Sequence, residues 1–274
     1  MILNKNKEIM DINKYIAKAA LSITYVFLAF LVIGFVACDK GNDPGQDEEE
    51  IPDDTTPSDE SNFYKLIRVE NFQGTQDNNF ESAAAAIYYS LENNKPMEAK
   101  YQQTNRWDLA FGGLLNSFVS GNNGSNSTNS GYGNTAKGGI AIIEKPFDEV
   151  TDIPVDSEFK TGGNLIGTDN YGEFGEGIGW YLYDFAGIIV RDGAYANQHV
   201  AYALDRPLTL KNGTVVPPRT VIVRTAKGNY AKIKLISLYK DQFERSEWTR
   251  SSPKVYFTFE YILAPAGSTK FEIK

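Results

Sequence analysis

The chain has 274 residues, a formal net charge of −8, one histidine and one cysteine. An acidic chain without a basic cluster is poorly suited to bind nucleic acid, because phosphates attract a basic surface. A single cysteine excludes an internal disulfide and a multi-thiolate metal site, and a catalytic nucleophile lacks its usual partners. The acidic residues Asp108, Asp184 and Asp205 carry no glycosidase motif. We therefore expect no enzymatic activity and assign no metal site.

Residues 1–37 have the composition of a targeting segment. Four lysines precede residues 19–37, an uncharged and mostly apolar run that ends just before Cys38. The residues Phe35-Val36-Ala37-Cys38 resemble the end of a bacterial lipoprotein signal, although phenylalanine is less usual than leucine at its first position. The resemblance implies cleavage before Cys38 and diacylation of that cysteine, so that the protein meets the membrane only through its lipid.

Two other interpretations of this N-terminus stay open. The apolar run could nearly cross a hydrocarbon core of ~30 Å, so the segment could act as an uncleaved membrane anchor. The lack of a cationic flank after the run argues against an anchor. Translation could also begin at Met10 instead of Met1, which would give a signal of more ordinary length.

Residues 38–60 are predicted to be the lipidated cysteine and an acidic, disordered tether. Asp39 to Glu60 contains ten acidic residues, one lysine and no aromatic residue, so it has too little apolar surface to collapse. Fully extended, these residues would reach about 75 Å. Acidic residues after a lipidated cysteine also resemble the surface-export signal of Bacteroidetes lipoproteins, which implies an outer-membrane, cell-surface location. The alternative is a solvated spacer that carries no export signal.

Residues 61–274 are predicted to form one antiparallel β domain that ends in a β-meander. The β-branched run 221–223, a turn at residues 227–229 and an alternating return run from Tyr230 indicate a hairpin over residues 219–239. On the return run, three apolar residues share one face and two lysines lie on the other, solvated face: Ala231, Ile233 and Leu235 against Lys232 and Lys234. Residues 255–262 repeat the alternation and can extend the same sheet.

The rest of the domain also favours strands. Residues 81–91 combine four alanines, which favour a helix, with Ile-Tyr-Tyr, which favours a strand; we predict a strand over residues 86–91. Other apolar runs predict strands at 63–69, 107–111 and 140–143, one or two strands over 180–190, and a glycine-rich loop over most of 112–139. Because residues 61–274 lack a long apolar period of 3.6 residues, the predicted fold class is all-β.

Four parts of the domain carry a family resemblance. They are Trp107-Asp108-Leu109-Ala110-Phe111, the glycine-rich loop through Ser130-Gly131-Tyr132-Gly133 and Lys137-Gly138-Gly139, the element Gly177-Ile178-Gly179-Trp180, and Val221 to Tyr239. Together they resemble the HmuY family, the haem-binding lipoproteins of Bacteroidetes. The resemblance implies an all-β, HmuY-like domain that grips one haem between strand-borne loops, with two axial His or Met ligands. It also implies capture of haem or a related porphyrin for uptake, with an outer-membrane haem receptor as a partner.

The chain departs from that pattern at the expected iron ligands. The segment from Tyr181 to Phe185 contains neither His nor Met, and Met97, the only methionine outside the signal, lies far from it in sequence. Tyrosinate is a known ligand of haem iron, so Tyr181 or Tyr183 could take this role, with His199 as a second candidate. The alternative hypothesis is a binding or structural surface lipoprotein that has lost haem and recognises a glycan or a protein.

The lipoprotein hypothesis predicts that Cys38→Ser abolishes lipidation, because the thioether to diacylglycerol needs the sulfur of this residue. Labelling with palmitate in a bacterium that processes lipoproteins measures the outcome, with the unsubstituted protein as the labelled control. Label retained on the Cys38→Ser protein would contradict the hypothesis.

Overall fold

The computed structural model describes residues 51–75 and 83–273. The predicted signal, Cys38 and the first part of the predicted tether, residues 39–50, lie outside the described residues. The described chain consists of strands, short 3-10 helices and loops and contains no α-helix, which confirms the predicted all-β fold class. No helix in these residues has the length and apolar character needed to cross a membrane.

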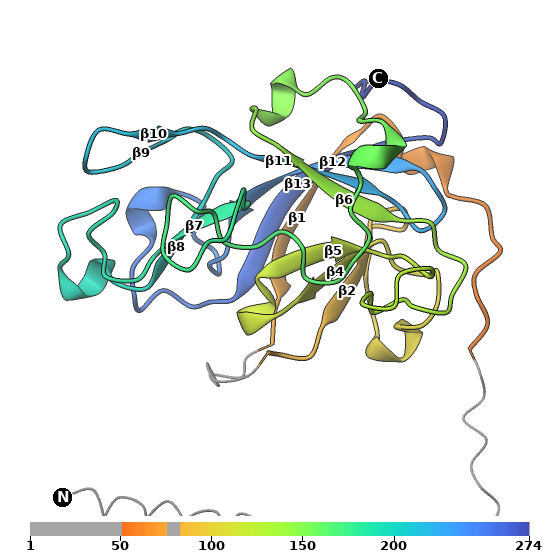
Figure 1. The fold of residues 1–274 in the computed structure, drawn as a ribbon, viewed down its shortest axis with the longest axis horizontal. Coiled ribbons are helices and arrows are strands. Elements are labelled where there is room, and N and C mark those ends of the chain that lie inside the picture. Colours follow the sequence, from red (N-terminus) through yellow and green to blue (C-terminus); the bar gives the residue numbers. More distant parts are fainter. Residues whose placement is uncertain (1–50, 76–82, 274) are drawn as a thin grey trace, which may run out of the picture. The chain divides into compact units, whose positions relative to one another are not determined.

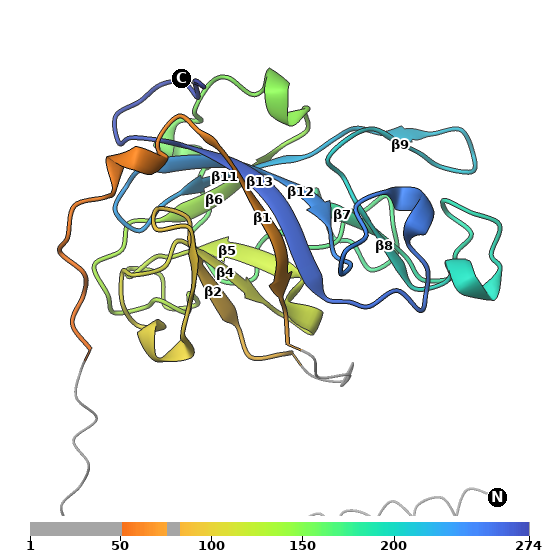
Figure 2. The same cartoon turned by 180° about the vertical axis from the view of Figure 1, so that it is seen from behind.

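The larger sheet has five antiparallel strands in the order β1-β13-β12-β11-β6 (Figure 1). Their bounds are β1 Leu66–Gln73, β6 Gly139–Ile143, β11 Thr220–Arg224, β12 Tyr230–Ser237 and β13 Tyr256–Ala264. Strands β11, β12 and β13 are neighbours in chain order, so the predicted C-terminal β-meander is confirmed. Strand β1 pairs with β13, which places the first and last strands of the domain side by side (Figure 2).

The second sheet has four strands in the order β3-β2-β4-β5, and two strand pairs complete the fold. The sheet comprises β2 Ile87–Ser90, β3 Lys95–Met97, β4 Leu109–Gly112 and β5 Phe118–Gly121. The pairs are β7 Tyr181–Asp184 with β8 Val200–Ala203, and β9 Leu208–Thr209 with β10 Val215–Val216. The 3-10 helices are η1 Glu60–Asn62, η2 Ala99–Tyr101, η3 Leu114–Asn116, η4 Phe147–Glu149, η5 Asp156–Glu158, η6 Tyr195–Asn197 and η7 Arg245–Glu247.

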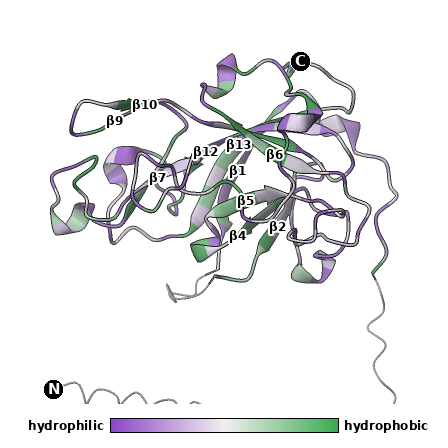
Figure 3. Cartoon of the chain, in the orientation of Figure 1, coloured by the Kyte–Doolittle hydropathy of each residue, from purple (hydrophilic) through white to green (hydrophobic). Residues whose placement is uncertain are grey.

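The main hydrophobic core lies between the two sheets. The rings of Phe111 in β4 and Phe257 in β13 have centroids 4.7 Å apart, and Tyr89 of β2 meets Phe259 edge-on at 5.5 Å. Trp180 stacks on Phe257 at 6.1 Å, and all five side chains are buried. The hydrophobic residues follow the strands of both sheets (Figure 3). Large aromatic side chains bury ~150–250 Å² each, so this contact layer supplies much of the stability of the domain.

The predicted C-terminal hairpin is present. Val221 pairs with Ile233 and Val223 with Ala231, and the turn contains Gly228 at a φ of 92°, a backbone conformation that glycine adopts without strain. The apolar residues of β12 face the main core as predicted.

The opposite face of this sheet is less solvated than the alternation predicts. Lys232 donates from Nζ to the carbonyl oxygens of Phe147 at 2.8 Å and Val150 at 2.9 Å. Ile222 and Phe271 belong to a second apolar cluster on this face. The expectation of one solvated face is therefore wrong here, because the segment around η4 and the C-terminal residues cover it.

Of the strand predicted over residues 86–91, Ile87–Ser90 form β2, and residues 83–86 precede it outside any helix or strand. Tyr88 packs against Trp107 with ring centroids 4.8 Å apart, while Tyr89 faces the main core. A strand places adjacent side chains on opposite faces, so it gives both rings a buried environment, whereas a helix would hold them on neighbouring parts of one surface. The strand preference of Ile-Tyr-Tyr is therefore confirmed, and the alanines before it form no helix.

Of the one or two strands predicted over residues 180–190, the structure contains only β7 in this range. The chain leaves the strand at Asp184, whose buried carboxylate accepts the backbone N–H of Ile189 at 3.3 Å and of Val190 at 2.9 Å. These N–H groups are thus satisfied by a side chain and not by a neighbouring strand, which is why the apolar run 186–190 forms a turn-rich loop.

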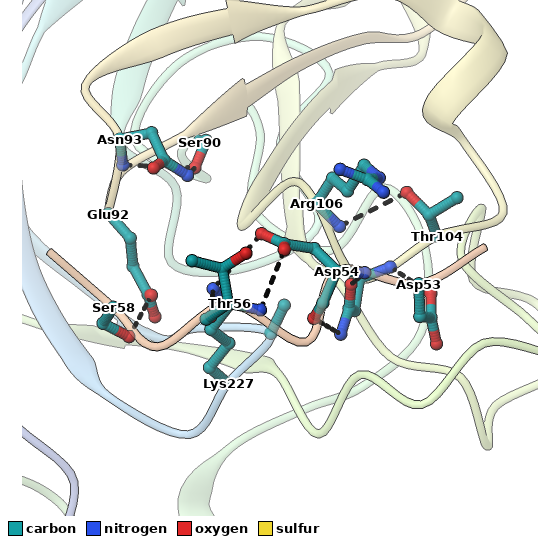
Figure 4. Close-up of polar contacts among 12 residues, drawn as sticks. Asp53, Asp54, Thr56, Ser58, Ser90, Glu92, Asn93, Thr104, Arg106 and Lys227 are labelled. Atoms are coloured by element: carbon teal, nitrogen blue, oxygen red, sulfur yellow. Dashed lines mark hydrogen bonds and ion pairs between the residues drawn. The ribbon is translucent and has the colours of Figure 1, made fainter. Parts of the chain in front are cut away.

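The described part of the predicted tether, residues 51–60, is held on the domain (Figure 4). Asp53 accepts the backbone N–H of Asn105 at 2.7 Å, and the Asn105 side chain accepts the N–H of Asp54 at 2.7 Å. Lys227 lies 3.4 Å from the Asp54 carboxylate. The prediction of disorder therefore fails for residues 51–60, because their carboxylates have fixed donors that composition does not reveal.

Ser58 of this segment contacts a buried carboxylate pair formed by Glu92 and Asp108. Ser58 donates to one oxygen of Glu92 at 2.5 Å (Figure 4), while Thr225 and Asn229 donate to the other at 2.6 and 2.8 Å. Asp108 accepts the backbone N–H of Glu92 at 3.2 Å. Burial and the neighbouring Glu92 carboxylate raise the pKa of Asp108 from 3.8 to about 7.

This pair predicts a pH-dependent stability. The folded state holds the Asp108 proton more tightly than the unfolded chain, so this stabilising contribution is complete below pH 3.8 and is lost as the pH rises to about 7. Glu92→Gln removes one charge, while its amide can still donate to Ser58 and accept from Thr225. We expect the free energy of unfolding of the Glu92→Gln protein to depend less steeply on pH. At pH 7 this free energy should be larger than that of the parent by an amount on the order of 1 kcal/mol.

Urea unfolding at several pH values between 4 and 8 measures this slope, with Glu158→Gln at an exposed position as the matched control. Equal slopes in the Glu92→Gln protein and its parent would show that the carboxylate pair does not control the pH dependence.

Candidate functional site

A cavity of about 630 Å³ lies where the β7–β8 pair faces residues 114–118 and the ends of β12 and β13. Figure 1 shows this strand pair at one end of the large sheet. The volume falls within the range of pockets that hold small molecules. Most of the wall is apolar, with side chains that include Leu114, Leu115, Phe118, Phe174, Phe185 and Leu238.

The β7–β8 pair sets the side chains of one wall. Tyr181 and Tyr183 are two positions apart on β7 and both line the cavity, as the alternation of a strand requires. His199 directly precedes β8 with a φ of 55°, in the left-handed region. Its N–H donates to the carbonyl oxygen of Phe185 at 3.0 Å, which fixes the backbone at the end of the pair.

The structure places all three predicted site residues, Tyr181, Tyr183 and His199, around this one cavity. The Tyr183 hydroxyl lies 2.9 Å from Nδ1 of His199, whereas the Tyr181 hydroxyl donates to Oγ of Ser117 at 2.9 Å. Burial raises the pKa of Tyr181 to about 12. Burial and the carboxylate of Glu173 raise the pKa of Tyr183.

His199 is held as a neutral imidazole. Burial and the positive charges of Arg250 and Lys254 lower its pKa below the ordinary value of 6.5. The ring of Phe185 meets the imidazole edge-on with centroids 4.5 Å apart, which fixes the plane of the ring. At neutral pH one ring nitrogen of His199 is therefore free of a proton and can accept a hydrogen bond or bind a metal ion.

Two cations border the cavity. Arg250 donates to the side-chain oxygen of Gln198 at 3.1 Å, and Lys254 donates from Nζ to the carbonyl oxygens of Arg250 and His199 at 3.1 and 3.3 Å. These acceptors are neutral, and the Arg250 guanidinium also lies 4.3 Å from the centre of the Tyr195 ring. The cavity thus combines apolar walls with cations, an arrangement that suits a flat apolar ligand with anionic groups.

Sequence reasoning did not identify Phe174, Arg250 or Lys254 as part of the site. Phe174 comes from the glycine-dense segment before β7, and the two cations come from the segment between β12 and β13. None of them lies in a motif, and they meet the predicted residues only through the tertiary fold. The described residues contain no group of three or more His, Cys, Asp or Glu side chains arranged to hold a metal ion.

The loop that carries Phe174 is fixed by a buried ion pair. Arg219 donates from Nη2 and Nε to one oxygen of Asp169 at 2.9 and 3.1 Å, and both residues are buried. The same oxygen accepts the N–H of Gly179 at 3.0 Å, and the other accepts the N–H of Tyr171 at 3.0 Å. Asp169 therefore ties both ends of the loop to the start of β11.

The described residues form an all-β domain with a mainly apolar cavity. The family model described as HmuY protein matches residues 82–261, and the chain therefore belongs to the HmuY family. This family consists of binding and uptake proteins.

Several solved structures are similar to the chain. An apo HmuY analog of Tannerella forsythia has 12% identity, covers 73% of this chain and 95% of its own, and has a TM-score of 0.32. A candidate HmuY-like haem-binding protein of Bacteroides vulgatus ATCC 8482 has 14% identity, 75% and 94% coverage and a TM-score of 0.30. A candidate lipoprotein of Bacteroides fragilis NCTC 9343 has 16% identity, 74% and 92% coverage and a TM-score of 0.27. No curated protein matches the chain.

The Asp169–Arg219 pair predicts that Arg219→Leu lowers the free energy of unfolding by about 3–5 kcal/mol, because it leaves a buried carboxylate without its counter-ion. Urea unfolding at pH 7 measures the loss. Arg206→Leu is the matched control, since Arg206 is half-exposed and pairs with the exposed Glu244; it should cost less than about 1 kcal/mol. A loss of similar size in both variants would contradict the assignment.

Proposed function

We propose that this protein is a surface lipoprotein that binds haem or a related porphyrin in the cavity and serves haem uptake. The observation that carries the proposal is the cavity, whose apolar walls enclose about 630 Å³ and whose polar side chains include two phenols, one imidazole and two cations. Membership of the HmuY family supports it. Lipidation of Cys38, attachment to the outer membrane and transfer to an outer-membrane haem receptor belong to the same proposal.

The chemistry of haem suits this set of side chains. A porphyrin ring is flat and apolar, so its burial against aromatic and aliphatic walls provides affinity without directional contacts. Haem also carries two propionates, which can pair with Arg250 and Lys254. Arg250 and Lys254 line the cavity, so they place positive charge beside a bound ring although the chain as a whole carries a net charge of −8.

Ligands for iron are present, although they are not the His and Met pairs that the family resemblance implies. Tyr181, Tyr183 and His199 carry oxygen or nitrogen atoms that bind haem iron in proteins. The alternative, recognition of a glycan or a protein, has less support, because a cavity with mainly apolar walls offers few hydrogen-bonding partners to a sugar. No catalytic role is part of the proposal.

An absorbance titration tests the proposal on residues 50–274, which form one compact unit with its own core. We expect ferric haem and iron-free porphyrin each to bind saturably at one molecule per chain, with a Kd of about 1 μM or lower. Ala201→Trp, which places an indole on the cavity wall, should lower the affinity for each compound by tenfold or more. Val215→Trp adds the same ring at an exposed site of β10 and should leave both affinities unchanged.

The proposal requires saturable binding that the Ala201→Trp variant loses while its unfolding midpoint shows it to be folded. Absence of saturable binding with both compounds would refute it. Binding that Ala201→Trp and Val215→Trp leave equally unchanged would show that the ligand does not occupy this cavity.

A further inference from the structure

The two tyrosines of the cavity have different hydrogen-bond partners. The Tyr181 hydroxyl donates to Ser117 Oγ at 2.9 Å, and the Ser117 hydroxyl in turn donates to the carbonyl oxygen of Leu114 at 2.7 Å. This chain of donors ends on a backbone carbonyl, which cannot accept a proton at neutral pH. The phenol of Tyr181 is therefore held in its protonated form and buried in the wall, with an exposure of 6%.

Tyr183 lies beside the only imidazole of the chain. Its hydroxyl is 2.9 Å from His199 Nδ1, and its side chain is only partly buried. An imidazole that carries its proton on Nε2 presents a lone pair at Nδ1, so it can accept the phenol hydrogen. Of the two phenols of β7, only that of Tyr183 contacts a nitrogen base.

Four further contacts hold this pair in place. The ring of Phe185 meets the imidazole edge-on at 4.5 Å, and Phe174 lies 6.1 Å from the ring of Tyr183. The backbone of His199 is in the left-handed region, donates to the Phe185 carbonyl and accepts from Nζ of Lys254. A non-glycine residue in this conformation is uncommon, and the surrounding contacts over-determine it, as at sites whose geometry matters for function.

We propose that Tyr183 is the protein ligand of ferric porphyrin iron and that His199 is a positioning residue that accepts its proton. This inference rests on the proposed function. On binding of ferric porphyrin, the Tyr183 proton would pass to His199 Nδ1 and the proton on Nε2 would leave to solvent, so that the imidazole stays neutral and the phenolate oxygen would hold the iron. No electron is transferred, so no oxidant or reductant is required.

A phenolate is an anionic oxygen ligand and favours the harder ferric ion over ferrous iron. The site should therefore take up oxidised haem and hold reduced haem less tightly. It differs in this from a pocket that recognises the porphyrin ring alone, which would bind the ferric, ferrous and iron-free compounds about equally. The inference thus names both the residue that binds the iron and the oxidation state of iron that the site prefers.

Titration of residues 50–274 and three variants with ferric haem and with iron-free porphyrin tests the inference. We expect the parent to give a high-spin ferric spectrum with a phenolate-to-iron charge-transfer band. Tyr183→Phe should lose this band and bind ferric haem at least tenfold more weakly, a difference of about 1.4 kcal/mol. Its affinity for iron-free porphyrin should stay within about twofold, which also shows that the variant is folded.

Tyr132→Phe is the matched control, since it removes an exposed phenol that does not line the cavity and should keep the band. His199→Ala should lower the affinity for ferric haem, while the complex that still forms should keep the phenolate-to-iron band. Dithionite reduction should lower the affinity of the parent more than that of Tyr183→Phe.

The opposite results separate the two proposals. If the parent binds both compounds and Tyr183→Phe keeps the ferric spectrum, the inference is overturned and the proposed function stands. If His199→Ala removes the ferric spectrum and Tyr183→Phe retains it, His199 is the ligand and the inference is likewise overturned. If neither compound binds to the parent, both proposals fail.

Discussion

The aromatic contact between Phe111 of β4 and Phe257 of β13 joins the two sheets, and the position of the cavity depends on it. Trp180 stacks on Phe257 and donates from its indole N–H to the carbonyl oxygen of Ser117 at 3.0 Å. The residue directly before β7 is thereby fixed both to the large sheet and to the segment that forms the opposite wall. Tyr181 follows at once and reaches the side chain of the same Ser117. The core that stabilises the fold therefore also sets the distance between two walls of the cavity.

The parts of the fold that could be predicted from the sequence are those whose signals are local. The hairpin over residues 219–239 combines β-branched residues, a glycine turn and alternation within one continuous stretch, and these pair with each other. Residues 51–60 and 186–190 differ, because distant or irregular side-chain contacts decide their course. Asp54 forms hydrogen bonds with Asn105 and Lys227, which are 51 and 173 residues away in sequence. No local pattern encodes these contacts.

The candidate site was predictable to a similar extent. Tyr181 and Tyr183 stood out because the family resemblance implies a ligand in their segment, which contains neither His nor Met, and His199 stood out because it is the only histidine. Their common cavity could not be derived from the sequence, since the chain between β7 and β8 is a long loop whose turns depend on the Asp184 carboxylate. Phe174, Arg250 and Lys254 reach the site from other segments. The residues around β7 alone therefore predict neither the positive charge of the cavity nor much of its apolar wall.

In the proposed haem site, the walls of the cavity and the side chains proposed to bind iron have different structural origins. The walls come from several segments held by the main core, so no single substitution removes them. A bond to iron depends instead on one or two side chains at fixed positions. Ring burial is non-directional, whereas a metal–ligand bond is directional. Under this proposal, a pocket without the His or Met pair would therefore keep its affinity for the ring, and a phenol that already contacts a base would supply a ligand without any change to the walls.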